Sequence, residues 1–119
     1  MSWVLPSLKG TLDGTAIRVP TPNVSLIDLT LVTEQEVTPE SINDAMSKAA
    51  KGELKGILDV NQKPLVSKDV NHNPHSSIFD ATQTQVIKGK FSRVLSWYDS
   101  EGGFSKRMCD TAIQIEKLM

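Results

Sequence analysis

The chain has 119 residues, of which 39% are hydrophobic and 23% charged, and its formal net charge is −1 at pH 7. These values are ordinary for one soluble domain, and the scattered lysines and arginines form neither a basic face for nucleic acid nor an acidic tail. No stretch approaches the about 20 apolar residues of a membrane helix, and the first residues lack an apolar run of signal-peptide length. We therefore expect one cytoplasmic domain over residues 1–119, with no nucleic-acid or membrane partner.

The segment before the first helix signals reads as extended chain. Residues 16–34 are rich in β-branched and aliphatic side chains, and Pro20 and Pro22 disfavour helix. Apolar residues occupy both faces of the strand expected from Asn23 to Thr33. One face carries Ile27, Leu29 and Leu31, and the other carries Val24, Leu26 and Val32. We expect this strand to be covered on one side and partly on both.

Residues 38–52 carry helix signals in the order in which a helix needs them. Thr38 is a natural N-cap, Pro39 suits the first helical position, and Gly52 is a natural stop. Between them, apolar side chains recur at the spacing of one buried stripe, namely Ile42, Ala45, Met46, Ala49 and Ala50. The pattern predicts an amphipathic helix.

After this helix the apolar period returns to two, in segments separated by Asn, Gly, Pro and His clusters. The expected strands are residues 56–60, 64–70, 76–89 and 92–99. From Ser100 onward, Phe104, Met108, Ala112 and Ile115 restore helical spacing. This order of elements predicts an α+β fold, with a mainly antiparallel or mixed sheet and helices on one face.

Few residues resemble a catalytic or metal site. The sequence has no glycine-rich phosphate loop and no Cys/His set with zinc spacing, so we expect no metal. His72 and His75 have no acidic or cysteine ligand arranged beside them, and we interpret them as solvent-facing turn residues. Cys109, the single cysteine, has no histidine near it in the sequence, and we interpret it as a buried thiol rather than a nucleophile.

Arg18 is a better candidate for a binding site. Apolar residues flank it and a Pro-x-Pro segment follows, a placement that suits an anion site. The alternatives are an exposed arginine at a strand end and a buried ion pair with Asp28 or Asp13. The residues alone leave these readings open.

Four stretches of the chain, in order, resemble the catalytic domain of phosphorylating glyceraldehyde-3-phosphate dehydrogenases. They are GTAIRVPTPNVSLIDLT, KGILDV, HSSIFDA and SWYDSEGGFSKR, and the resemblance runs from about Leu5 to the chain end. The stretches NHNPHSSIFDATQTQV and FSKRMCDT also resemble the erythrose-4-phosphate dehydrogenase branch. The resemblance implies the α+β C-terminal domain of that family, whose enzymes are much longer than this chain.

In that family the upstream part supplies the NAD-binding domain, the nucleophilic cysteine and the histidine that activates it. The resemblance therefore implies a C-terminal fragment without the N-terminal NAD-binding domain. Such a fragment has no catalytic residue, binds no cofactor alone and is inactive alone, whereas the intact family uses NAD. Cys109, His72 and His75 match none of the family's catalytic positions.

Two functional positions of the family do fall inside this chain. Arg18 matches the arginine that binds the substrate phosphate and the attacking phosphate. Ser100 stands where the family has an asparagine that orients the nicotinamide, and Gly102 and Phe104 replace a tryptophan and a tyrosine. We expect Ser100 to cap the last helix and Gly102 to weaken it. These changes indicate relaxed cofactor constraints; a divergent enzyme with another cofactor geometry is the alternative.

Three functional hypotheses follow from the resemblance. The first is a C-terminal catalytic domain of a glyceraldehyde-3-phosphate dehydrogenase-like oxidoreductase, inactive alone. The second is one half of a split enzyme that works with a separate NAD-binding chain. The third is a non-catalytic oligomerisation or interaction module. In the family this domain packs its sheet on that of a neighbour, and the apolar two-faced strand agrees with a homo-oligomer formed through the sheet.

Overall fold

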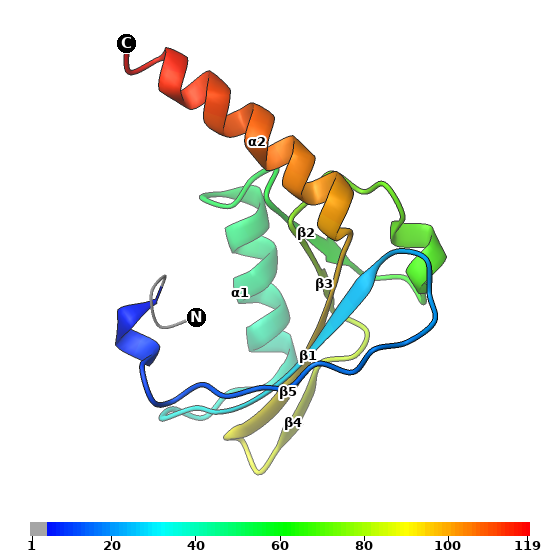
Figure 1. Ribbon diagram of the computed structural model, residues 1–119. Coiled ribbons are helices and arrows are strands. Elements are labelled where there is room, and N and C mark those ends of the chain that lie inside the picture. The colour runs from blue at the N-terminus through cyan, green and yellow to red at the C-terminus, as the bar shows by residue number, and fades with distance from the viewer. Residues whose placement is uncertain (1–4) are drawn as a thin grey trace.

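The computed structural model describes residues 5–119, which form a five-stranded mixed sheet and two α-helices (Figure 1). The strands are β1 (Ser25–Val32), β2 (Leu58–Asn61), β3 (Ser77–Asp80), β4 (Gln85–Ile87) and β5 (Phe91–Tyr98). The helices are α1 (Pro39–Lys51) and α2 (Ser100–Glu116), with short 3-10 turns η1 (Pro6–Leu8) and η2 (Ser67–Val70). The α+β fold predicted from the order of elements is confirmed.

The long strand β5 is the centre of the sheet. One edge of β5 pairs antiparallel with β1 along its whole length, from Ser25 opposite Tyr98 to Val32 opposite Phe91. The other edge pairs with β3 near the end of β5 and with β4 near its start. β2 then adds to β3 in parallel, which makes the sheet mixed.

The helix α1 forms as its capping signals predict. The Thr38 side chain accepts from the backbone N–H of Ser41, and the Ser41 hydroxyl accepts from the backbone N–H of Thr38, which makes a reciprocal capping box. The helix packs against β2. The Asn43 side chain also links it to the connection after β3, because its Nδ2 donates to the Ala81 carbonyl at 3.1 Å. Much of the predicted stripe is half-buried, but Ala45 is exposed.

The edge strand β1 is less covered than we expected. Most of its apolar side chains are exposed, on both faces, with Leu26 at 41% and Ile27 at 51%, whereas Leu31 is half-buried. The expectation of a strand covered on one side is therefore wrong for the described residues. The physical reason is that α1 packs against β2, at the opposite edge of the sheet from β1.

Two other strand predictions, over residues 64–70 and 76–89, were wrong in detail. In both segments an aspartate side chain accepts from a nearby backbone N–H, which favours a turn over a strand. The expected strand over 64–70 is an irregular loop that ends in η2, where the Asp69 carboxylate accepts from the backbone N–H of Val66. The expected strand over 76–89 is two strands. It breaks after Asp80, whose carboxylate accepts from the backbone N–H and the hydroxyl of Thr82.

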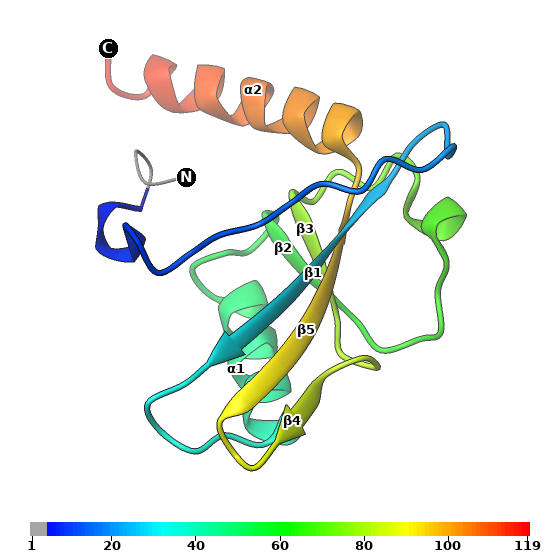
Figure 2. The ribbon, with the colours of Figure 1, turned by 60° about the horizontal axis from the view of Figure 1, so that its bottom comes forward.

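The helix α2 leaves the end of β5 and runs away from the sheet (Figures 1 and 2). Its apolar side chains, Phe104, Met108, Ile113 and Ile115, are exposed in the described structure. Cys109 on this helix is exposed as well, so the interpretation as a buried thiol is wrong. The helical spacing was read correctly, but nothing within residues 5–119 covers the apolar side chains of the helix.

Candidate functional site

The junction between β5 and α2 is organised by one buried carboxylate, that of Asp99. Asp99 is 1% exposed and accepts four hydrogen bonds. One oxygen, Oδ1, accepts from the backbone N–H groups of Glu101 and Gly102 at 3.0 and 2.9 Å. The other, Oδ2, accepts from the backbone N–H of His72 and from Asn23 Nδ2, both at 2.8 Å.

Asp99 is therefore the N-cap of α2, and the expectation that Ser100 caps this helix is wrong. Ser100 is instead the first residue of the helix. Asp and Ser are about equally good N-caps, so capping preference alone does not choose between neighbours. Asp99 has the longer acceptor group, and its second oxygen is free to bind residues outside the helix.

The hydrogen bonds lower the pKa of Asp99 below its usual value. The backbone N–H of Gly102 is the largest cause, burial acts in the opposite direction, and the remaining donors reinforce the lowering. The carboxylate is stabilised by N–H dipoles rather than by a cationic side chain. At neutral pH the charged form is therefore the one that holds these donors together.

Two residues at or next to the groups that donate to Asp99 adopt left-handed backbone conformations. His72, whose N–H binds Asp99, has φ 64°, and Val24, which follows Asn23, has φ 69°. Such a conformation costs roughly 1–3 kcal/mol for a non-glycine residue, and it persists where surrounding contacts enforce it. Val24 is also part of the hydrophobic core, together with Val70 and Ile78. The hydrogen bond to Asp99 therefore stabilises the strained backbone at His72, and core packing stabilises the strained backbone at Val24.

The two glycines at the start of α2 lie close to neighbouring atoms. A Cβ on Gly103 would lie 3.1 Å from the carbonyl oxygen of His75, so a side chain there would force the helix or that loop to shift by a few tenths of an ångström. A Cβ on Gly102 would lie 3.3 Å from the Asp99 carboxyl carbon. Gly103 therefore has a packing role in the described structure.

Arg18 lies in the irregular chain between η1 and β1 and is exposed. Within the described residues its guanidinium makes no hydrogen bond or ion pair, so of the alternatives left open, the exposed arginine is the one found. Asp28 is engaged by Arg93, at 2.8 Å to Nε and 2.6 Å to the terminal nitrogen. Asp13 accepts from the backbone N–H of Gly14.

The histidines and Ser100 do not assemble into a catalytic group among residues 5–119. His72 is exposed, as expected, but His75 is half-buried, and its Nδ1 lies 2.8 Å from Asn73 Oδ1. No set of three His, Cys, Asp or Glu residues in this part of the chain could hold a metal ion. Within the same range, no helix is long and apolar enough to cross a membrane.

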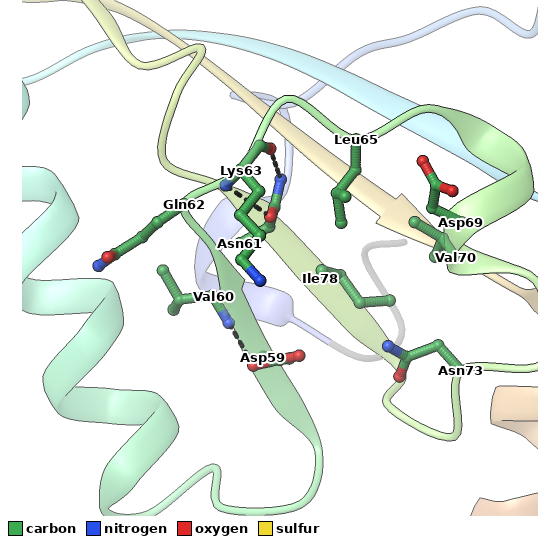
Figure 3. A pocket seen from close by; sticks show the side chains of 10 residues that line it. All are labelled: Asp59, Val60, Asn61, Gln62, Lys63, Leu65, Asp69, Val70, Asn73 and Ile78. Atoms are coloured by element: carbon green, nitrogen blue, oxygen red, sulfur yellow. Dashed lines mark hydrogen bonds between the residues drawn. The ribbon is translucent and has the colours of Figure 1, made fainter.

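A hollow of about 260 Å³ lies between β2 and η2, and Figure 3 shows the side chains around it. Asn61 spans the loop at its rim, donating to the Lys63 carbonyl at 2.6 Å and accepting from the Lys63 N–H at 2.9 Å. Neither Arg18 nor Ser100 lines the hollow. It is separate from both residues that the sequence singled out.

Asn23 and Asp99 were missed as site residues by the sequence reasoning. A signal was present, because Asp99 directly precedes a helix and Asn23 follows a Pro-x-Pro segment, positions where short polar side chains commonly bind backbone groups. Their partnership could not be seen, since 76 positions separate them in the sequence.

The fold and this junction define an α+β domain in which a capped C-terminal helix follows the central strand of a mixed sheet. The chain belongs to the family described as "Glyceraldehyde 3-phosphate dehydrogenase, C-terminal domain", whose model matches residues 1–100. This confirms the resemblance seen in the sequence.

Curated relatives cover nearly the whole chain. The glyceraldehyde-3-phosphate dehydrogenase of Xanthobacter flavus is 57% identical over 115 residues, or 97% of this chain. That of Cereibacter sphaeroides is 53% identical over 116 residues, and glyceraldehyde-3-phosphate dehydrogenase 1 of Bacillus subtilis is 54% identical over 117, each covering 98% of this chain. The chain spans only 34–35% of the length of these relatives.

Proposed function

We propose that this chain is the substrate-binding catalytic domain of a glyceraldehyde-3-phosphate dehydrogenase-like oxidoreductase and has no dehydrogenase activity alone. The observation that carries the proposal is the extent of the similarity, which covers nearly the whole chain but only about a third of relatives bearing that name. Cys109 is exposed on α2 and has no hydrogen bond to a histidine among the described residues. A thiol without a base beside it is a poor nucleophile for aldehyde chemistry.

Arg18 is the residue that we assign to the phosphate of the substrate. Its guanidinium is exposed and unpaired within residues 5–119, so its donors are available to an anion. A planar guanidinium binds phosphate through two parallel N–H bonds, which fixes orientation as well as charge. A lone arginine in water binds weakly, so we expect tight binding only when other parts of an enzyme add donors.

Ser100 is assigned to the side of the domain that faces the cofactor. It offers an exposed hydroxyl at the start of α2, one residue after the buried cap. The hollow beside η2 borders neither Ser100 nor Arg18, so it gives no support to a dinucleotide site at these two residues. In this proposal NAD is bound by another part of the enzyme, in the same or a separate chain, and this chain alone binds none.

The test is reconstitution with the remaining part of the Bacillus subtilis relative, produced separately. We expect NADH formation from glyceraldehyde 3-phosphate in the mixture and in neither part alone. The variant Arg18→Gln should raise KM strongly, because a bidentate phosphate contact is lost. Activity of this chain alone that disappeared in Cys109→Ser would contradict the proposal, as would an inactive mixture whose two parts elute together.

The exposed strand β1 favours a second role, as a module that assembles copies of this chain. Leu26, Ile27 and Leu29 leave an apolar surface on a sheet edge, and such surfaces usually mark interfaces. We expect light scattering to give a molecular mass that is a multiple of 13.1 kDa. Ile27→Lys should lower this mass, and Gln35→Lys, in the loop that follows β1, should leave it unchanged. A mass that stays at 13.1 kDa at all concentrations would contradict this role.

A further inference from the structure

Asp99 joins two stretches of chain that carry the residues assigned above. Its Oδ2 accepts from Asn23 Nδ2 at 2.8 Å, and its Oδ1 accepts from the Gly102 N–H at 2.9 Å. Ser100 is the next residue along the chain, and Arg18 lies five positions before Asn23. One carboxylate therefore lies between the substrate-facing segment and the cofactor-facing helix start.

The link between Arg18 and Asn23 is stiff. Pro20 and Pro22 fix two of the backbone φ angles, and the backbone N–H of Thr21 donates to the Val19 carbonyl at 2.9 Å. Five residues span at most about 18 Å when fully extended, and this turn shortens the path further. The place where Asn23 is held therefore limits how far Arg18 can move.

Asn23 makes the hydrogen bonds that tie this segment to distant parts of the chain, and the next residue, Val24, packs into the core. Between residues 12 and 24 of the described structure, the hydrogen bonds to distant parts of the chain come from the Asn23 side chain alone. Its Nδ2 donates to Asp99 Oδ2 and, at 2.7 Å, to Asn71 Oδ1. Of these two acceptors, Asp99 is buried and charged, whereas Asn71 is exposed. The charged acceptor makes the stronger bond.

We propose that Asp99 is a positioning residue, which acts through Asn23 to set the place of Arg18 relative to Ser100 and the start of α2. The inference rests on the proposed function, in which Arg18 binds the substrate phosphate. A phosphorylated aldehyde must have its phosphate and its reacting carbon placed together, and a displacement of about 1 Å at such a contact can cost about 100-fold in rate. Asp99 touches neither, so its effect is on geometry.

The test compares two variants of the full chain by 15N NMR relaxation. Asn23→Ala removes the donor to Asp99 and leaves the helix cap in place, whereas Asn71→Ala removes only the other acceptor. We expect the order parameters of residues 18–22 to fall from about 0.85 to below about 0.6 in Asn23→Ala and to stay high in Asn71→Ala. Residues of β5 and α2 should be unchanged in both. Asp99→Asn, which keeps a capping oxygen but turns an N–H₂ group toward Asn23, should loosen residues 18–22 as Asn23→Ala does.

Three results would overturn the proposal. Residues 18–22 could remain ordered in Asn23→Ala, Asn71→Ala could loosen them equally, or β5 could lose order to the same extent, as a purely structural role predicts. Titration with inorganic phosphate separates this inference from the proposed function. If phosphate shifts the amide signals of Ile17 and Val19 in the unmodified chain and shifts them equally in Arg18→Gln, the phosphate assignment fails while the relaxation data still decide the role of Asp99.

Discussion

Replacing Asp99 by alanine should be among the most destabilising single changes in this domain. The variant loses the N-cap of α2, which is worth about 1 kcal/mol. It also leaves the N–H of His72 without its acceptor in a part-buried position, and an unsatisfied buried donor costs about 1–3 kcal/mol. The expected loss in the free energy of unfolding is therefore about 3 kcal/mol, a large fraction of the 5–15 kcal/mol typical of a domain.

Urea titration at pH 7, followed by far-UV circular dichroism, measures this loss directly. At roughly 4 °C per kcal/mol for a chain of this size, the melting temperature should fall by about 12 °C. Asp99→Asn is the matched control, because asparagine caps a helix about as well as aspartate and keeps one acceptor. We expect it to lose less than half as much. A loss below about 0.5 kcal/mol in Asp99→Ala would show that water replaces the four bonds without penalty and would refute the reasoning.

Gly103→Ala should destabilise the chain by about 1 kcal/mol, because overpacking against the His75 carbonyl outweighs the gain in helix propensity; a raised melting temperature would contradict this. The lowered pKa of Asp99 should make its stabilisation complete above the unfolded pKa of about 3.9 and lost as the pH falls through the lower folded pKa. Urea titrations between pH 7 and 2.5 should show this fall, and Asp99→Asn should flatten it. Cys109 should react with a thiol reagent in the folded chain as fast as in urea, and strong protection would contradict its exposure.

The helix α1 could be predicted from the sequence because its signals are local. Thr38 and Ser41 are three residues apart, and their reciprocal bonds depend on nothing else in the chain. The same locality explains the success at β5, whose alternating residues are flanked by turns. The break after Asp80 was missed although it too is local, because residues 76–89 were taken together as one strand with an apolar period of two.

The candidate site was harder to predict, because it depends on contacts between distant residues. Asp99, Asn23 and His72 meet only after the sheet has formed, and no periodicity in the sequence joins them. Arg18 was singled out by its apolar flanks and the Pro-x-Pro segment after it, and the family resemblance then gave it a role, whereas Ser100 was singled out through the resemblance alone. The exposure of α2 was missed for a related reason, since an apolar stripe predicts that a surface is to be buried but does not say what covers it.

The position of β5 in the chain has a consequence for folding during synthesis. β1, β3 and β4 all precede β5 in the sequence, and each of them pairs with it. Until Phe91–Tyr98 has left the ribosome, β2 and β3 are the one pair of described strands that can form, and the apolar residues of β1 have no partner strand. The ladder between residues 25 and 98 closes a long loop, which slows folding. A nascent chain that stalls before residue 91 therefore exposes its first strand to other chains and to chaperones.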